Sequence, residues 1–161
     1  MTGSTWLKLG GLLATALVGL PVVVLAVLSY YSRKPTNVGL VDGWLADCPD
    51  KPNCVCSQAL EVSHRIAPID FSDASDTAWQ RMKSVVSAMP HTKIVSEQDG
   101  YLHAECQTSV FRFVDDLELL LDAERQVIHC RSASRVGHSD FGVNRRRIEG
   151  LRRAFAAQTH P

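Results

Sequence analysis

One segment of the sequence gathers side chains that could bind an anion. Residues 131–145 carry hydroxyls, guanidiniums and two glycines, and they lead into an expected helix. The free N–H groups and the positive dipole end at a helix N-terminus favour negatively charged ligands. The sequence therefore predicts a site for an anionic small molecule, a lipid headgroup or a carboxylate of a partner. Its ligand-binding residues are Arg131, Ser132, Ser134, Arg135, Ser139, Asn144 and Arg145.

The same guanidiniums could instead be neutralised from within the protein. Arg145, Arg146 and Arg147 fall early in the expected helix, where a cation is disfavoured by about 0.3 to 1 kcal/mol and a compensating anion is needed. Three acidic residues could supply it as a structural network: Asp115, Asp116 and Asp140. In this alternative the protein has a structural or scaffolding role, and the network only stabilises the fold.

The sequence supports a catalytic function less well than a binding or a structural one. His138-Ser139-Asp140 contains the residue types of a hydrolase triad, but neighbouring residues do not normally converge on one point. Asp115 and Asp116 alternate along a strand and therefore point to opposite faces. The sequence contains no G-x-S-x-G, G-x-x-x-x-G-K-[ST] or H-E-x-x-H motif. A hydrolase or a metal-dependent enzyme is thus the third hypothesis, and we expect no catalytic residue, cofactor or metal.

The five cysteines leave at least one thiol without an intramolecular partner. Cys48 and Cys54 frame a short loop that a disulfide could close in an oxidising compartment. Cys56 and His64 would complete four zinc ligands, although structural zinc sites favour C-x2-4-C spacing, which this pattern lacks. Free thiols are the remaining alternative.

The N-terminal region predicts a membrane anchor. Residues 9–28 contain no charge and consist almost entirely of Leu, Val, Ala and Gly, and about 20 apolar residues in a helix span a bilayer. We expect a single-pass anchor over residues 1–32, a tether with the cysteine loop over 33–60, and a globular domain over 61–161. The short N-terminal tail and the cysteines favour an inner-membrane protein with its domain on the periplasmic side. A cleavable signal peptide is the alternative.

The rest of the chain predicts an α+β domain, in which two helices pack on an antiparallel sheet of about four strands. Helical spacing of apolar residues covers 73–89 and 141–156, and Asp140 can cap the second helix. The expected main strands are 92–98, 101–106, 109–121 and 126–133, and Asp99-Gly100 predicts a tight hairpin. Beyond Lys8, 16 Lys and Arg face 17 Asp and Glu. This balance predicts no nucleic-acid partner.

Strand alternation assigns side chains to the two faces of this sheet. We expect Leu119 opposite Ile128 on the buried face, and Asp116 opposite Arg131 on the other. The first hairpin would set Leu102 against Phe113. The polar face would hold His103, Glu105, Arg112, Asp116, Glu118, His129 and Arg131. It is interpreted as a solvated sheet face, with a binding surface as the alternative. Asp115 falls on the apolar face, so either a bulge turns it away or a cation pairs with it, for which Arg135 is the candidate.

Three ordered motifs carry a family resemblance. They are Cys-Pro-x-x-Pro-Asn-Cys-Val at 48–55, Phe-Arg-Phe-Val-Asp-Asp-Leu-Glu at 111–118, and Arg-Ser-Ala-Ser-Arg-Val-Gly-x-Ser-Asp-Phe-Gly-Val-Asn-Arg-x-Arg-Ile-Glu at 131–149. Over about residues 45–156 the chain resembles the domain of unknown function family 1499. The resemblance implies a bacterial or plastid protein, often with a signal or membrane segment, and no established activity. Cys56 and His138 stand where the family pattern has Ser and Tyr. Both departures argue against a family-wide C-x-C metal site and a catalytic histidine at 138.

Overall fold

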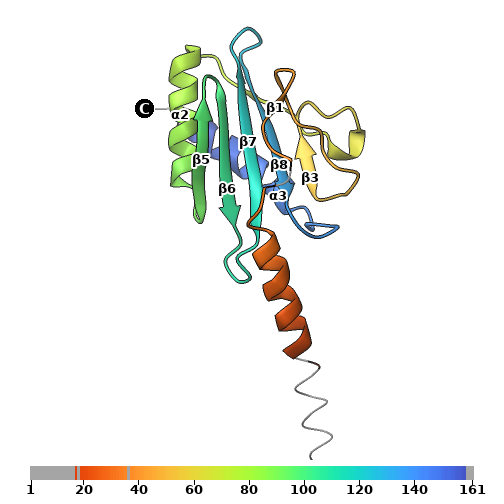
Figure 1. The fold of residues 1–161 in the computed structure, drawn as a ribbon. Helices are drawn as coiled ribbons and strands as arrows, with labels where there is room; N and C mark the ends of the chain where they lie inside the picture. Colours follow the sequence, from red (N-terminus) through yellow and green to blue (C-terminus); the bar gives the residue numbers. More distant parts are fainter. Residues whose placement is uncertain (1–16, 18, 36, 159–161) are drawn as a thin grey trace, which may run out of the picture.

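An antiparallel sheet forms the centre of the molecule (Figure 1). The computed structural model describes residues 17, 19–35 and 37–158. The strands follow the order β3-β8-β7-β6-β5, and β4 also pairs with β8. Their bounds are β3 Cys54–Cys56, β4 Ile69–Asp70, β5 Thr92–Gln98, β6 Tyr101–Gln107, β7 Val114–Asp122 and β8 Val127–Ser134. The predicted α+β class is confirmed, but the sheet is larger than the four strands expected.

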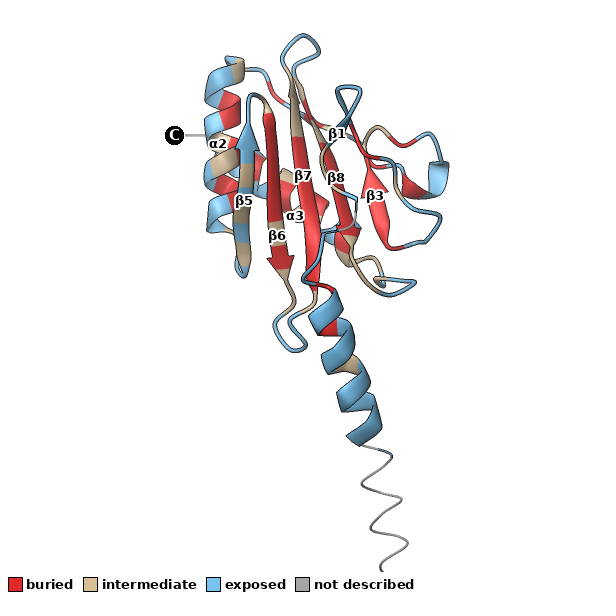
Figure 2. Cartoon of the chain, viewed as in Figure 1, coloured by how far each residue is buried: buried red, intermediate tan, exposed pale blue. Residues whose placement is uncertain are grey.

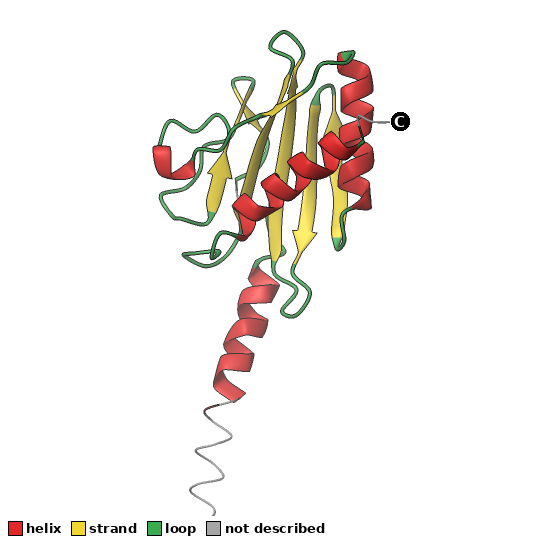
Figure 3. Cartoon of the chain, turned by 180° about the vertical axis from the view of Figure 1, so that it is seen from behind, coloured by secondary structure: helices red, strands yellow, loops and turns green. Residues whose placement is uncertain are grey.

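Two helices cover one face of the sheet (Figure 3). Helix α2, Ser75–Ala88, buries Trp79, Met82 and Val86, and it ends before Pro90, which lacks the N–H needed to continue it. Helix α3, Val143–Ala157, crosses the sheet and buries Ile148, Leu151 and Phe155. These side chains meet the apolar residues of the strands in one core, whose strand members include Leu102, Leu117, Leu119, Ile128 and Cys130.

The opposite face of the sheet is covered by the segment that follows the N-terminal helix. This N-terminal segment comprises residues 32–35 and 37–59. Residues 33–60, expected to form an irregular tether, contain a small hairpin of β1, Leu40–Val41, and β2, Trp44–Leu45. They also supply β3, which pairs with β8. A one-turn 3₁₀ helix, η1, Val62–His64, follows β3 in the chain. Figure 2 shows how far burial extends over β6, β7 and β8. The interpretation of the polar face as solvated is therefore wrong, because the N-terminal segment includes the residues that pack over it.

The strand register differs from the prediction by two residues between β7 and β8. Leu119 lies opposite Cys130, and Glu118 lies opposite Arg131. A shift of two residues keeps every side chain on its predicted face, because side chains alternate with period two. The pairing of β6 with β7 differs more from the prediction. Leu102 lies opposite Leu119, because residues 108–113 form a loop and β7 begins only at Val114.

The loops at one end of the sheet contain unusual backbone. Arg112, in the β6–β7 loop, and Phe141, in the β8–α3 loop, adopt φ of 55° and 52°. Positive φ is disfavoured for residues with a large side chain. Gly142 then carries φ 76° at the entry to α3, a conformation that glycine adopts without strain.

A helix precedes the domain and leaves it at this same end (Figure 1). Its described residues are 17 and 19–31, and nearly all of them are exposed. Among the described residues, no helix has the length and hydropathy to cross a membrane. Much of the predicted anchor over residues 1–32, namely 1–16 and 18, lies outside the residues that the structure describes.

Candidate functional site

The buried polar face centres on Glu118 and Arg131. Glu118 is 0% exposed and Arg131 2% exposed, and Arg131 Nη1 donates to Glu118 Oε2 at 2.5 Å. The other carboxylate oxygen accepts from Tyr101 Oη at 2.8 Å and from the backbone N of Gly39 at 2.6 Å. Burial, and then the Glu118 carboxylate, raise the pKa of Tyr101, so the phenol stays protonated as a donor. Arg131 Nη2 also reaches the carbonyl of Asp47 at 3.4 Å.

A second cluster on the same face surrounds Asp116. Arg135 donates from Nε and Nη2 to Asp116, at distances of 2.6 to 3.1 Å, and from Nη2 to Glu105 at 2.7 Å. His103 Nε2 lies 2.7 Å from Asp116 Oδ1. Burial opposes ionisation of Asp116, but the hydrogen bonds from His103 and Arg135 outweigh it and hold the pKa of that carboxyl below its usual value. Burial likewise opposes the charge on Arg135, whose pKa is nevertheless raised by its two acidic partners.

The side chains of a third cluster lie on the helix-covered face of the sheet. Asp115 pairs there with Arg147 of α3 at 2.5 Å, and not with Arg135 as predicted. The reason is parity: Arg135 follows the polar face of β8, whereas Asp115 faces α3. Arg147 Nη1 also donates to the hydroxyl of Ser132 at 2.8 Å.

Asn144 has all of its amide groups paired in this third cluster. Its Oδ1 accepts from Ser132 Oγ at 2.7 Å and from Arg147. Its Nδ2 donates to the carbonyl of Asn53 at 2.9 Å and to Ser134 Oγ at 3.0 Å. Asn144 is 0% exposed, so the amide fastens α3 to β8 and to the loop before β3.

The beginning of α3 is capped from within. Asp140 accepts the backbone N–H groups of Gly142 at 3.0 Å and Asn144 at 2.7 Å. The helix begins at Val143, two residues later than predicted, and its N-cap residue is Gly142 rather than Asp140. The Asp140 carboxylate still accepts an N–H of the first turn, that of Asn144. Ser139 Oγ accepts from the N of Phe141 at 3.3 Å. Arg145 lies exposed and donates to the carbonyl of Arg65 at 3.0 Å.

The predicted ligand-binding residues therefore divide between several places. Arg131 and Arg135 lie on the polar face, while Ser132, Ser134 and Asn144 form bonds on the α3 side. Ser139 and Arg145 are exposed. Of the predicted structural network, Asp115 and Asp116 pair with arginines and Asp140 caps the helix.

A cavity of about 130 Å³, the polar cavity, nevertheless brings together three of the predicted ligand-binding residues, Arg131, Ser134 and Arg135. It lies between the cysteine loop and the end of β8. Its walls comprise Asn37, Pro49, Lys51, Asn53, Asp116, Arg131, Ala133, Ser134, Arg135 and Gly137. Two of these residues each have a buried polar atom, Arg131 Nε and Asn53 Oδ1, without a hydrogen-bond partner among the described residues. Buried polar groups are nearly always paired, so each such atom calls for an explanation.

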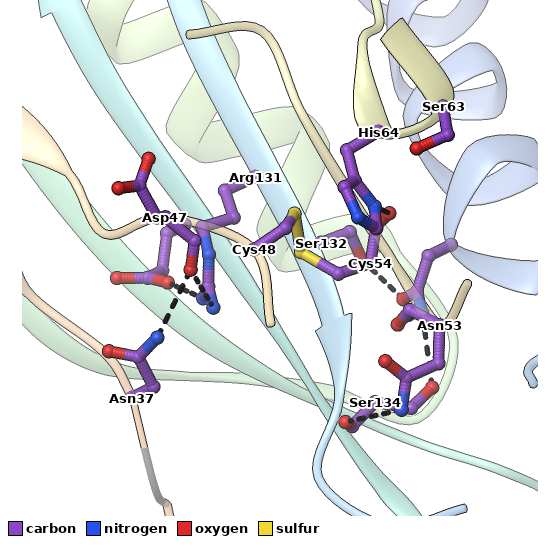
Figure 4. The surroundings of a disulfide bond; sticks show 12 residues. Asn37, Asp47, Cys48, Asn53, Cys54, Ser63, His64, Arg131, Ser132 and Ser134 are labelled. Atoms are coloured by element: carbon purple, nitrogen blue, oxygen red, sulfur yellow. Dashed lines mark hydrogen bonds and ion pairs between the residues drawn. A yellow bond between two sulfur atoms is a disulfide. The ribbon is translucent and has the colours of Figure 1, made fainter. Parts of the chain in front are cut away.

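Sequence reasoning missed Lys51, Asn53 and Asn37 at this cavity. The predicted disulfide was the available signal, because closing the Cys48–Cys54 loop carries Lys51 and Asn53 to the edge of β8. The disulfide is present in the structure, which confirms that prediction (Figure 4). Asn53 Nδ2 donates from this loop to the carbonyls of Ser134 and Gly137 at 3.3 and 3.0 Å.

The remaining cysteines are free and buried. Burial raises the pKa of the thiols of Cys56 and Cys106, and raises that of Cys130 to about 12. These thiols therefore stay protonated, unlike reactive cysteines. His64 Nδ1 lies 3.0 Å from the carbonyl of Cys54. Within the described part of the chain, no three His, Cys, Asp or Glu residues form a group that could hold a metal ion.

A serine, a histidine and an aspartate also meet at the far end of β8. Ser57 Oγ lies 3.2 Å from His129 Nδ1, and His129 Nε2 lies 3.7 Å from Asp122. Ser57 Oγ accepts the backbone N–H of Cys130 at 3.0 Å as well, so this hydroxyl ties the end of β3 to β8. Burial lowers the pKa of His129 and outweighs the opposing effect of Asp122.

Together these observations define a class of protein: an α+β domain whose helices cover one sheet face, while its own N-terminal segment covers the other through buried ion pairs. The chain belongs to the family described as Protein of unknown function (DUF1499), whose family model matches residues 44–155. The match confirms the resemblance carried by the three motifs. Comparisons with curated proteins and with solved structures found no match.

Proposed function

We propose that this protein is a membrane-anchored, non-catalytic module that binds a small anion in the polar cavity. The observation that carries the proposal is a cavity lined by Lys51, Arg131 and Arg135, one of which, Arg131, also has a buried Nε without a hydrogen-bond partner among the described residues. A donor left unpaired in the protein interior costs about 1 to 3 kcal/mol. An acceptor that reaches Nε from the cavity would remove that cost.

The size and chemistry of the cavity narrow the ligand class. A volume of about 130 Å³ corresponds to roughly four water molecules at their share of liquid volume. Glu118 and Asp116 already neutralise the two arginines. Exposed Lys51 has no carboxylate within ion-pair distance in the described residues, so it supplies the uncompensated charge. Asn53 Oδ1 would accept a hydrogen bond, which favours an anion that also carries a hydroxyl, such as hydrogen phosphate or a short hydroxycarboxylate.

Membrane anchoring is the second part of the proposal. Its support is the uncharged run of residues 9–28 and the exposure of apolar side chains such as Leu20, Val23 and Val27 on the N-terminal helix. An exposed apolar helix favours lipid over water. We further propose the inner membrane as the location, with the domain on the periplasmic side, where the Cys48–Cys54 disulfide can form and persist.

Thermal unfolding of the full chain in detergent micelles tests anion binding. Sodium phosphate or glycolate is compared with sodium chloride at equal ionic strength. A ligand at a hundredfold excess over its Kd stabilises the folded state by about 2.7 kcal/mol, so the unfolding temperature should rise. Lys51→Ala should reduce the rise, whereas Lys93→Ala, an exposed lysine on β5, should not. The same unfolding temperature in phosphate, glycolate and chloride would refute the anion site.

A structural role is the second candidate, and a specific set of contacts favours it. Arg131, Arg135 and Glu118 each pair with a charged side chain and also bond the backbone of the N-terminal segment, at Asp47, Ser32 and Gly39 respectively. The network would then serve to hold the segment on the sheet. Arg135→Gln distinguishes the two candidates. Loss of the folded domain favours the structural role, and a folded domain without phosphate stabilisation favours the binding site.

A further inference from the structure

Two loops at one end of the domain expose large apolar side chains. The β6–β7 loop holds Val110, 79% exposed, and Phe111, 47% exposed, and the β8–α3 loop holds Phe141, 87% exposed. The N-terminal helix leaves the domain at this end (Figure 1). Clustered exposed apolar side chains mark contact surfaces for proteins or membranes.

These loops and the helix share one hollow whose accessible lining is largely apolar. The hollow has a volume of about 330 Å³ and is lined by Leu25 and Leu28 of the helix and by Phe113, Val136 and Phe141 of the loops. The medium around the helix near Leu28, whether water or lipid, therefore also contacts the loops. Tyr30 and Tyr31, at the domain end of the helix, are exposed aromatics of the kind enriched at membrane interfaces.

The junction between helix and domain leaves little freedom to separate them. Ser32 directly follows the helix and is 0% exposed. Its hydroxyl accepts the N–H of Val114, the first residue of β7, at 3.1 Å, and its carbonyl accepts from Arg135 Nη1 at 3.1 Å. The helix thus ends in hydrogen bonds to the sheet rather than in a linker, so a membrane that holds the helix also lies against the adjacent loops.

We propose that the β6–β7 and β8–α3 loops enter the lipid headgroup region of the membrane and hold the domain in one orientation on it. This inference rests on the proposed membrane anchoring and is independent of the anion site. The lipid surface is the occupant because the apolar side chains continue the apolar helix. Exposed Arg33, Lys34 and Arg112 lie beside them, where they can meet anionic headgroups.

Site-specific labelling of the full chain in vesicles tests the depth of the loops. The chain is reconstituted in phosphatidylcholine with one quarter phosphatidylglycerol, and an environment-sensitive fluorophore is attached to Val110→Cys or to Val62→Cys. Val62 is a matched control, because it is 76% exposed and lies in η1, away from the helix exit. The native free cysteines are buried, and the unsubstituted chain gives their background labelling.

The label at position 110 should emit at shorter wavelength in vesicles, and lipids with a nitroxide near the headgroup should quench most of its emission. The label at position 62 should show neither effect. Equal, water-like behaviour of both labels in protein that stays with the vesicles through an alkaline wash would overturn the loop insertion alone. Release of the chain by that wash would overturn the anchoring and the loop insertion together.

Discussion

The two faces of the central sheet are buried by different physical means. Leu102, Leu117 and Leu119 meet apolar residues of α2 and α3 on one face. Glu118, Asp116 and Arg131 are equally buried on the other face, beneath the N-terminal segment. Apolar burial is favourable without direction, whereas a buried ion pair is often no more stabilising than a hydrophobic pair of similar size. The polar face is therefore better understood as specifying where the covering segment sits, which is a hypothesis that the following changes test.

Breaking one ion pair should produce the largest loss of stability. Arg131→Met leaves the Glu118 carboxylate buried without its cation, which costs about 3 to 5 kcal/mol. Urea denaturation of the full chain in micelles measures the change. Arg153→Met, at an exposed position of α3, should leave stability nearly unchanged.

Adding Glu118→Gln to Arg131→Met should recover much of that loss. The amide removes the buried charge and still accepts from Tyr101 and Gly39. A double variant no more stable than Arg131→Met would contradict the view that the uncompensated charge, and not lost packing, sets the cost.

The apolar face should respond to truncation in a different way. Leu117→Ala should cost about 2 to 5 kcal/mol, because the side chain is fully buried between sheet and helices and leaves a cavity. Leu60→Ala, at a position 89% exposed, is the control and should fall within about 0.5 kcal/mol of the parent. A loss below about 1 kcal/mol for Leu117→Ala would show that the helix-covered face is loosely packed.

A reductant should lower the stability of the protein only through the N-terminal segment, which contains the Cys48–Cys54 disulfide. The Cys48–Cys54 disulfide closes a loop with a sequence separation of 6, for which chain entropy gives a stabilisation of about 2 kcal/mol. The Cys48→Ser, Cys54→Ser double variant should lose about this amount in urea denaturation. Dithiothreitol should lower the unfolding free energy of the parent to that of the double variant, and it should leave the double variant unchanged. Any other result would argue against the disulfide as the source of this stability.

The polar face should also give stability a dependence on pH. Burial lowers the pKa of His129 in the folded state, so the unfolded chain binds more protons as the pH falls through the ordinary histidine value of about 6.5. The His129 contribution is therefore complete above that pH and decreases below it. The fall in unfolding free energy between pH 7.5 and 5.5 should be smaller in His129→Gln than in the parent. Exposed His138→Gln is the control and should follow the parent.

Local patterns in the sequence were sufficient for part of this structure. Alternation placed Leu117 and Glu118 on their correct faces, the Asp99-Gly100 turn was found, and Asp140 was identified as an acceptor for N–H groups at the beginning of α3. Each of these depends on neighbours within a few residues. The Cys48–Cys54 disulfide was predicted for the same reason, since its loop is short.

Features that depend on distant segments were not predictable in this way. The two-residue register error on β8 arose because alternation is unchanged by a shift of two. Nothing near Glu118 in the sequence shows that Gly39, 79 residues away, covers it. The candidate cavity was missed for the same reason, because Lys51 and Arg131 line one cavity only through the packing of the cysteine loop and β3 against β8.

The left-handed backbone at Phe141 implies that its side chain is retained at an energetic cost. A bulky residue with φ of 52° carries strain on the order of 1 to 2 kcal/mol, which glycine would avoid. Phe141→Gly should therefore leave the domain at least as stable in urea denaturation, and it should weaken the attachment of this loop to lipid. Arg112, on the neighbouring loop, has a similarly disfavoured backbone with φ of 55°. Glycine would relieve the backbone at both places, so the contribution of Phe141 and Arg112 to this end of the molecule is expected to come from their side chains.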